Sequence, residues 1–302
     1  MKKIVIAGGS GFLGNILVQH FAQKNYQVVV LTRSHQLDQR HVRYVKWDAK
    51  TTGAWTAELE HTEVLINLTG KSVDCRYTAQ NKQQIYNSRL DATYVLGQVV
   101  DTLTTPPKLW INAASATIYR HALDREMDEE TGEIGEGFSV DVCQKWERAF
   151  HQTKAIHTRK VALRIGIVLG RTGGALIPLK NLSRIGIGGK QGQGNQFFSW
   201  IHEKDFVGIV DHVIYHERLV GTYNVTSPSP VPNYEVMSAL RRVLKVPFGL
   251  PMPTWLLTLG AVIIRTEPEL ILKSRRVVPK KLLASGYSFH FDRIELALTD
   301  LI

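Results

Sequence analysis

The pattern of apolar and polar positions divides the first half of the chain into short apolar runs separated by amphipathic stretches. The runs are dominated by Val, Ile and Leu, which is typical of parallel strands buried on both faces of a sheet. Between several of them lie segments with apolar side chains at helical spacing, such as residues 12–23 and 88–103. This alternation predicts a doubly wound α/β fold around a parallel sheet. The expected strands are KKIVIA (2–7), QVVVLT (27–32), VRYVKW (42–47), VLINLT (64–69), KLWINAAS (108–115) and KVALRIGIVLG (160–170).

The pattern changes after Gly170, where glycines crowd residues 173–194. Residues 201–216 and 234–244 are expected to be helices, and residues 221–232 a strand that ends in a loop. We therefore expect a Rossmann domain and a smaller lobe over the carboxyl edge of its sheet. The predicted Rossmann domain comprises residues 1–170 plus about 202–227, and the predicted lobe comprises about 171–201 and 228–302.

The most apolar stretch of the second half, WLLTLGAVII (255–264), is only ten residues long. A transmembrane helix needs about 20 apolar residues, so we expect a buried helix instead. The N-terminal run is too short for a signal peptide and is interrupted by glycines. Cys75 and Cys143 make no disulfide framework, and no Cys/His spacing suggests zinc. These features predict a cytoplasmic protein without a metal site or a membrane partner.

Composition narrows the class of ligand. Of the 302 residues, 44% are apolar and 21% are charged, which is ordinary for a folded protein. The formal net charge is +10, but Lys and Arg are scattered and no nucleic-acid motif is present. Anionic small molecules are therefore expected as ligands, and nucleic acid is not. The substrate and the oligomeric state stay open.

A glycine turn follows the first expected strand, which runs straight into GGSGFLG and then a helix. Gly8 permits a tight turn, Gly11 lets a pyrophosphate approach the backbone, and Gly14 lets the helix pack on the strand. The helix N-terminus then presents free N–H groups to the phosphates. We predict a dinucleotide site here, the alternative being a flexible turn without a ligand. The predicted cofactor-binding residues of the turn are Gly8, Ser10, Gly11, Phe12, Leu13 and Gly14.

The end of the second expected strand bears on the identity of the cofactor. An acidic residue about 20 positions after the glycines would bind the ribose hydroxyls of NAD. This chain has Thr32 and Arg33 there, and a cation suits a 2′-phosphate, so NADP(H) is favoured over NAD(H). Arg33 is otherwise an ordinary exposed arginine. Asp48 is placed either near the adenine or as a cap of its own loop.

With the glycine turn in place, the segment NAASATIY (112–119) makes the chain resemble the short-chain dehydrogenase/reductase superfamily in its extended, epimerase-like form. The C-terminal half narrows the resemblance to a subgroup loosely called epimerase family proteins, which have an atypical active site and a characteristic C-terminal segment. This resemblance covers nearly the whole chain but implies no particular substrate. It rests on LRIGIVLGRTGGAL, GGKQGQGNQFFSWIHEKDFVGIV, GTYNVTSPSPVPNYEVMSAL and RRVVPKKLLASGYSF.

The resemblance implies further site residues. Ser115 stands at the place of the serine that hydrogen-bonds the reacting carbonyl or hydroxyl. Backbone groups near Ile167 and Val168 would meet the nicotinamide amide. The loop after the fourth strand, which would pass over the ribose, contains Leu68, Thr69 and Gly70. For both loops the alternative is plain turn chemistry.

The resemblance also implies a tyrosine and a lysine four residues apart, and the chain lacks both. In the superfamily the tyrosine transfers the proton, and the lysine lowers the tyrosine pKa from its usual value of about 10. In GFSVDVCQKWERAF (137–150), counting back from Glu147 puts Ser139 at the tyrosine and Cys143 at the lysine. A serine without a base is too weak an acid for this task, and a neutral cysteine supplies no cation.

Three accounts of the missing pair stay open. Either Tyr119 or His202 handles the proton, or Cys143 is reactive rather than an inert core residue, or the protein binds NADP(H) without turnover as a sensor or scaffold. We favour an NADP-dependent oxidoreductase or epimerase acting on a small carbonyl, hydroxyl or sugar-nucleotide substrate. Arg89 stands where many extended members carry asparagine, and it either reaches an anionic ligand or is a solvated helix charge.

Overall fold

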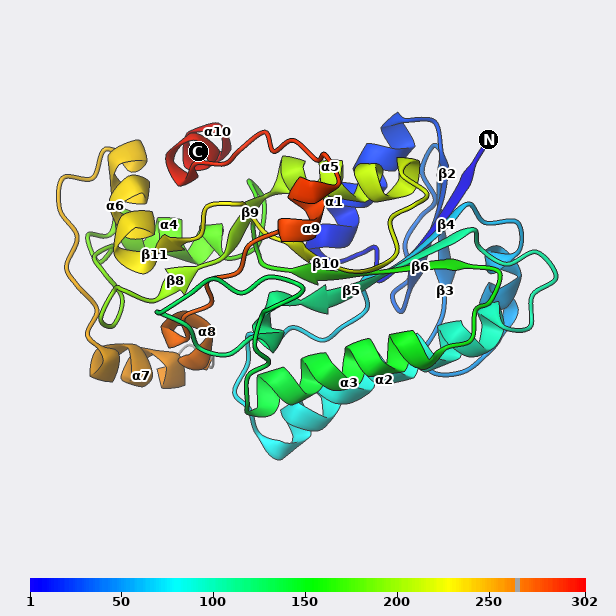
Figure 1. Cartoon of the computed structure of the whole chain (residues 1–302), viewed down its shortest axis with the longest axis horizontal. Coiled ribbons are helices and arrows are strands. Elements are labelled where there is room, and N and C mark those ends of the chain that lie inside the picture. Colours follow the sequence, from blue (N-terminus) through cyan, green and yellow to red (C-terminus); the bar gives the residue numbers. More distant parts are fainter. Residues whose placement is uncertain (264–266) are drawn as a thin grey trace.

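The computed structural model describes residues 1–263 and 267–302 (Figure 1). Its centre is a seven-stranded sheet with the order β10-β6-β5-β4-β1-β2-β3, and every neighbouring pair is parallel. This confirms the predicted doubly wound α/β class. The strands are β1 (Lys3–Ala7), β2 (Gln27–Thr32), β3 (Val42–Lys46), β4 (Val64–Asn67), β5 (Leu109–Ser115), β6 (Arg159–Ile165) and β10 (Gly221–Val225).

Helices cover both faces of the sheet (Figure 1). Because side chains alternate along a strand, Ile4 and Ile6 of β1 pack in the core under α1 (Phe12–Gln23) and α5 (Glu203–Tyr215). Val5 and Ala7 pack in the opposite core, under α2 (Ala79–Val100) and α3 (Phe138–Gln152). Burial on both faces explains why these strands are continuous apolar runs.

The sequence-based boundaries need two corrections. The α2 helix begins at Ala79 rather than near residue 88, because the Thr78 side chain caps it by accepting from Asn81 N at 3.2 Å. The expected strand 160–170 is two strands, β6 and β7 (Ile167–Leu169), and β7 leaves the main sheet to pair with β9 (Trp200–His202). The strand is interrupted at Gly166, where a Cβ would lie 2.6 Å from Ser199 O.

The second half adds a small lobe at one end of the sheet, as Figure 1 shows. Leu176, Trp200, Leu240 and Leu298 belong to its separate hydrophobic core. The lobe and its connections contain α4 (Leu176–Arg184), β8 (Phe197–Phe198), β11 (Val231–Pro232), α6 (Asn233–Leu244), α7 (Thr254–Ile263), α8 (Glu269–Leu272), α9 (Lys280–Ala284) and α10 (Ile294–Leu301). Two short 3-10 helices, η1 (Ala54–Leu59) and η2 (Ala116–Ile118), lie in the first half.

The α7 helix corresponds to the apolar stretch 255–264, of which residue 264 lies outside the described residues. The predicted helix is present, but the expectation that it is buried is wrong for its first turns. Leu257 is buried, whereas Trp255 is 69% exposed and Leu259 is 53% exposed, because α7 lies at the edge of the lobe (Figure 1). Among the described helices, none has the length and apolar character needed to span a bilayer.

Candidate functional site

A cleft of about 640 Å³ lies at the carboxyl ends of β1, β2 and β4. Ligands of open α/β sheets bind at this edge. The cleft brings together most of the sequence-predicted cofactor residues, while Phe12, Leu13, Gly14, Ile167 and Val168 are not part of its lining. Predicted residues that line it are Gly8, Ser10, Gly11, Thr32, Arg33, Asp48, Leu68, Thr69 and Gly70.

The structure explains the three glycines of the turn in different ways. Gly8 has a φ of +79°, which favours glycine, and Gly14 is required because a Cβ there would lie 2.5 Å from Gly9 Cα. At Gly11 the nearest atom to a Cβ would be Gly8 O, at 3.6 Å. Packing within the protein therefore does not require glycine at position 11. The space beside Gly11 opens into the cleft, where a ligand could approach the backbone.

The α1 helix begins directly at this turn. Its N-cap residue is Gly11, which has no side chain to cap the helix, and its first turn contains no acidic residue. The first N–H groups of a helix have no partner within the helix, so an anion in the cleft is a suitable acceptor for them.

Phe12 points away from the cleft into a socket of glycines. A Cβ at Gly170 would lie 2.5 Å from the Phe12 ring, and one at Gly173 would lie 2.4 Å from it. A Cβ at Gly174, which has a φ of +72°, would lie 2.9 Å from the same ring. The loop after β7 thus holds the first turn of α1 in place by close packing.

The rim of the cleft carries Arg33, which is exposed and has no ion pair within residues 1–263 and 267–302. Asp48, across the rim, accepts hydrogen bonds from Thr51 Oγ1 at 2.7 Å and from Lys50 N at 2.8 Å. The hydrogen bonds from Thr51 and Lys50 lower the pKa of Asp48 to about 2. Asp48 is therefore a loop cap that also lines the cleft.

The loop after β4 closes another side of the cleft. The Thr69 hydroxyl is buried and has no hydrogen-bond partner among the described residues. Arg89 Nη1 donates to Lys71 O at 3.0 Å and to Ile85 O at 3.1 Å, and its guanidinium lies 5.1 Å from the Trp146 ring centre. Arg89 is thus not a solvated helix charge, because it braces this loop against α2 and α3.

The strand β7 lies beside β9 rather than in the cleft. Ile167 N donates to Ser199 O at 2.8 Å, and the Val168 side chain packs in the core on the α1 side of the sheet. Contact of Ile167 and Val168 with a nicotinamide stays a prediction.

Ser115 ends β5 and is half-buried, with its Oγ accepting from Thr117 N at 3.2 Å. The Ser115 hydroxyl slightly lowers the pKa of the Cys143 thiol against the larger effect of burial. Burial raises the pKa of Cys143 to about 11, although the charge of Arg89 opposes the shift. Such a thiol is protonated near neutrality, which favours an inert core cysteine over a reactive one.

Tyr77 is the residue that sequence reasoning missed. Its Oη lies 3.3 Å from the Oγ of Ser139, the residue that the family resemblance predicts at the tyrosine position. Its ring packs edge-on against Phe138 at 4.8 Å, and burial raises the pKa of its phenol. Tyr77 lies in the irregular segment between β4 and α2, where no periodic pattern marks it.

Tyr119, a predicted proton carrier, is fully buried in a polar network. Its Oη donates to Asn224 Oδ1 at 3.0 Å and accepts from Arg164 Nη1 at 2.7 Å. Arg164 also forms a two-pronged ion pair with Glu147, at 2.7 and 2.8 Å. These contacts favour a structural role for Tyr119 and explain the glutamate on α3.

His202, the other predicted proton carrier, is also fully buried. Its Nδ1 accepts from Lys204 N at 3.0 Å and so caps α5, and its ring stacks on Phe291 at 3.9 Å. Burial lowers the pKa of His202 to about 4, even though Asp300 Oδ2 lies 3.4 Å from its Nε2. The imidazole is therefore neutral near pH 7, and its contacts favour a structural role.

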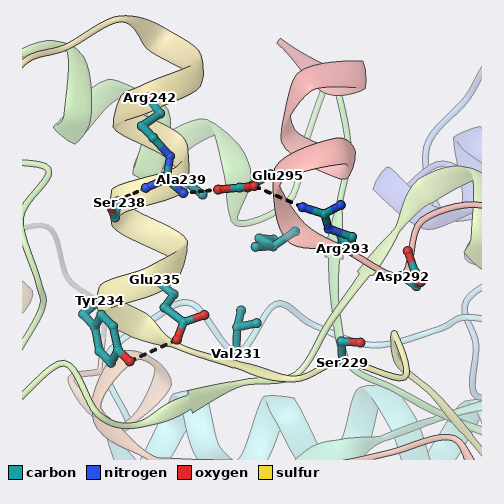
Figure 2. A pocket seen from close by; sticks show the side chains of 11 residues that line it. Ser229, Val231, Tyr234, Glu235, Ser238, Ala239, Arg242, Asp292, Arg293 and Glu295 are labelled. Carbon is teal, nitrogen blue, oxygen red and sulfur yellow. Dashed lines mark hydrogen bonds and ion pairs between the residues drawn. The ribbon is translucent and has the colours of Figure 1, made fainter.

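A second cleft, of about 480 Å³, lies between α6 and α10 (Figure 2). Arg242 and Arg293 both pair with Glu295 on its upper side, and Tyr234 Oη donates to Glu235 Oε1 at 3.0 Å. Its cations are thus neutralised by a shared carboxylate. It has no lining residue in common with the first cleft.

The fold and the first cleft define a Rossmann-type nucleotide-binding protein. The family model described as "NAD dependent epimerase/dehydratase family" matches residues 4–226. The chain belongs to this family, which confirms the membership expected from its motifs. A second model, "Domain of unknown function (DUF1731)", matches residues 252–301.

The chain is similar along nearly its whole length to curated relatives. It is 32% identical to the epimerase family protein YfhF of Bacillus subtilis, over 99% of this chain and 97% of that protein. It is 31% identical to the epimerase family protein SDR39U1 of Bos taurus, over 99% of each.

Solved structures agree with this relationship. The human epimerase family protein SDR39U1 (isoform 2), crystallised with NADPH, matches with a TM-score of 0.88 and 29% identity, over 99% of this chain and 98% of that one. A nucleoside-diphosphate sugar epimerase from Corynebacterium glutamicum matches with a TM-score of 0.78 and 27% identity, over 98% of this chain and 57% of that one.

Proposed function

We propose that the protein binds NADP(H) in the first cleft and acts on a small carbonyl or hydroxyl compound. The observation that carries the proposal is the open space at Gly11 beside a helix N-terminus that lacks a capping side chain on its cap residue, with Arg33 at the rim making no ion pair among the described residues. The NADPH in the human relative's structure supports the choice of cofactor.

The residues present fit this group. The backbone of Gly8, Ser10 and Gly11 and the first turn of α1 would hold the pyrophosphate, and Arg33 would pair with the 2′-phosphate. The buried Thr69 hydroxyl, which lacks a partner among the described residues, is a donor for the ribose side. When bound, the reduced cofactor supplies a hydride to a carbonyl carbon.

Ser115 would hydrogen-bond the reacting oxygen from the end of β5, and Tyr77 Oη would deliver a proton to that oxygen. Burial keeps the Tyr77 phenol protonated near neutrality, so the proton that reduction requires is present on Oη. Tyr119 and His202 stay predictions for this task, but their own hydrogen bonds leave no obvious access to the reacting oxygen.

Calorimetric titration with NADPH and NADH tests the cofactor assignment. We expect NADPH to bind at least about tenfold more tightly than NADH, and Arg33→Ala to remove most of that preference. Arg40→Ala, an exposed arginine that does not line the cleft, is the matched control and keeps the preference. Equal affinities in the wild type, or an unchanged preference in Arg33→Ala, would refute the 2′-phosphate contact.

The alternative is a non-catalytic NADP(H) sensor or scaffold. It is favoured by the raised pKa values of Tyr77 and Cys143, since neither group is tuned toward neutrality. A screen of carbonyl compounds for NADPH oxidation, with Ser115→Ala as control, separates the two functions. Tight NADPH binding with no oxidation, together with a cofactor-dependent change in protease sensitivity, would select the sensor.

A further inference from the structure

Arg275 carries a buried guanidinium with one unsatisfied edge. Its Nε and Nη2 atoms are both buried and donate no hydrogen bond within the described residues. Glu269 Oε1 lies 3.6 Å from Nη2, which is an ion-pair distance but too long for a hydrogen bond. Buried donors without acceptors are rare in native proteins, so this edge requires an explanation.

The backbone fixes Arg275 firmly in position. Arg275 N donates to Phe197 O at 3.2 Å, and Ser199 Oγ donates to Arg275 O at 2.5 Å. Two residues on, the buried Val277 side chain packs in one cluster with Cys143 of α3. The backbone that carries this guanidinium is therefore anchored at both its N–H and its carbonyl group.

The surroundings of Arg275 are those of the candidate reaction centre. Val277, two residues after Arg275, packs in one buried cluster with Cys143, and Ser139 lies one helical turn before Cys143 on α3. The same C-terminal region also holds Tyr77, because Glu267 Oε1 accepts from Tyr77 N at 2.6 Å. Arg275 thus belongs with the Tyr77–Ser139 hydroxyl pair.

The chemistry of the free edge selects a ligand class. Nε–H and Nη2–H lie on one side of the guanidinium plane, and their spacing matches two oxygens of a carboxylate or phosphate. The other nearby cations are engaged: Arg89 donates to backbone carbonyls, and Lys273 pairs with Glu269 at 3.3 Å. Arg276 Nε is also buried without a partner among the described residues, but Arg276 Nη2 donates to Glu126 Oε1 at 3.3 Å, so in the described part of this region only Arg275 offers an incoming anion two adjacent donors.

We propose that the Nε–Nη2 edge of Arg275 binds an oxyanion of the substrate, a carboxylate or a phosphate, beside Tyr77 and Ser139. The inference rests on the proposed NADP(H)-linked function and narrows its substrate to a small acidic carbonyl or hydroxyl compound. The segment that contributes Arg275 lies in the C-terminal region of unknown function.

The test uses the full chain saturated with NADPH and calorimetric titration of malonate, inorganic phosphate and the neutral malonamide. We expect malonate or phosphate to bind saturably and malonamide not to bind. The anion with the higher affinity indicates whether the acidic group of the substrate is a carboxylate or a phosphate. Arg275→Gln weakens that binding at least about tenfold, and Arg275→Lys gives an intermediate loss because it keeps the charge without the fork. Arg276→Gln is the matched control, since the neighbouring Arg276 pairs with the exposed Glu126, and it changes binding less than about twofold.

Glu269→Gln separates a binding role from a structural one. Removing the competing carboxylate tightens anion binding if Arg275 is a ligand site, whereas a purely structural pair leaves anion binding unchanged. The inference is overturned if neither anion binds the wild type, or if Arg275→Gln and Arg275→Lys bind the anion as the wild type does. We expect the Arg275 variants to bind NADPH as tightly as the wild type does. If the wild type itself does not bind NADPH, that result counts against the proposed function and not against the role of Arg275.

Discussion

Tyr77 and Ser139 lie 62 positions apart in the chain, yet their hydroxyl oxygens are 3.3 Å apart. Ser139 is the α3 residue that the family resemblance predicts at the tyrosine position, and the segment before α2 brings the Tyr77 hydroxyl next to it. The Glu267 carboxylate holds the Tyr77 backbone, because Glu267 Oε1 accepts a hydrogen bond from Tyr77 N at 2.6 Å.

Replacing Tyr77 by Phe should lower kcat for carbonyl reduction by roughly 10²-fold or more, because the proton donor is removed. NADPH affinity should stay within about twofold, since Tyr77 does not line the cofactor cleft. Tyr94→Phe, at a side chain that is 49% exposed, is the control and keeps full activity. A Tyr77→Phe enzyme with wild-type kcat would assign the proton to another group.

The buried His202 should make stability depend on pH. The pKa of His202 is about 4 in the folded protein and 6.5 as its ordinary value, so the unfolded chain binds the proton first. Stability from this group is fully present above pH 6.5 and is lost as the pH falls toward about 4, by at most about 3 kcal/mol.

Urea denaturation between pH 7 and 4 measures this effect. The slope of the free energy of unfolding against pH should be flatter in His202→Asn than in the wild type, because asparagine binds no proton. His157→Asn, at an exposed position, should leave the slope unchanged. Equal slopes in the wild type and His202→Asn would mean that the imidazole accepts its proton in the folded state.

Gly173→Ala should destabilise the protein by about 1–3 kcal/mol, because the new Cβ would lie 2.4 Å from the Phe12 ring. The displaced first turn of α1 should also weaken NADPH binding. Phe12→Leu combined with Gly173→Ala should recover part of the loss in a double-mutant cycle. Gly53→Ala, where the nearest atom would be 3.7 Å away, is the control and changes stability by less than about 1 kcal/mol. Additive effects of Phe12→Leu and Gly173→Ala would exclude the proposed packing.

The sequence predicts the sheet and much of the lining of the first cleft, because both depend on local patterns. Runs of buried Val, Ile and Leu mark β1, β2 and β4, and the glycines mark the turn before α1. The break at Gly166 escapes such reasoning, because it arises where the chain passes close to Ser199. Tyr77 and Arg275 are missed for the same reason: each comes from irregular backbone, and only the tertiary fold brings them to α3.

The contact between Glu267 and Tyr77 joins the two segments that match separate family models, residues 4–226 and 252–301. Both segments therefore contribute residues to the candidate reaction centre. A chimera that exchanged one of them with a distant relative would keep the cofactor cleft but separate the phenol from the carboxylate and the guanidinium beside it. The two segments are thus expected to be inherited together, and substrate choice can be transplanted only with both.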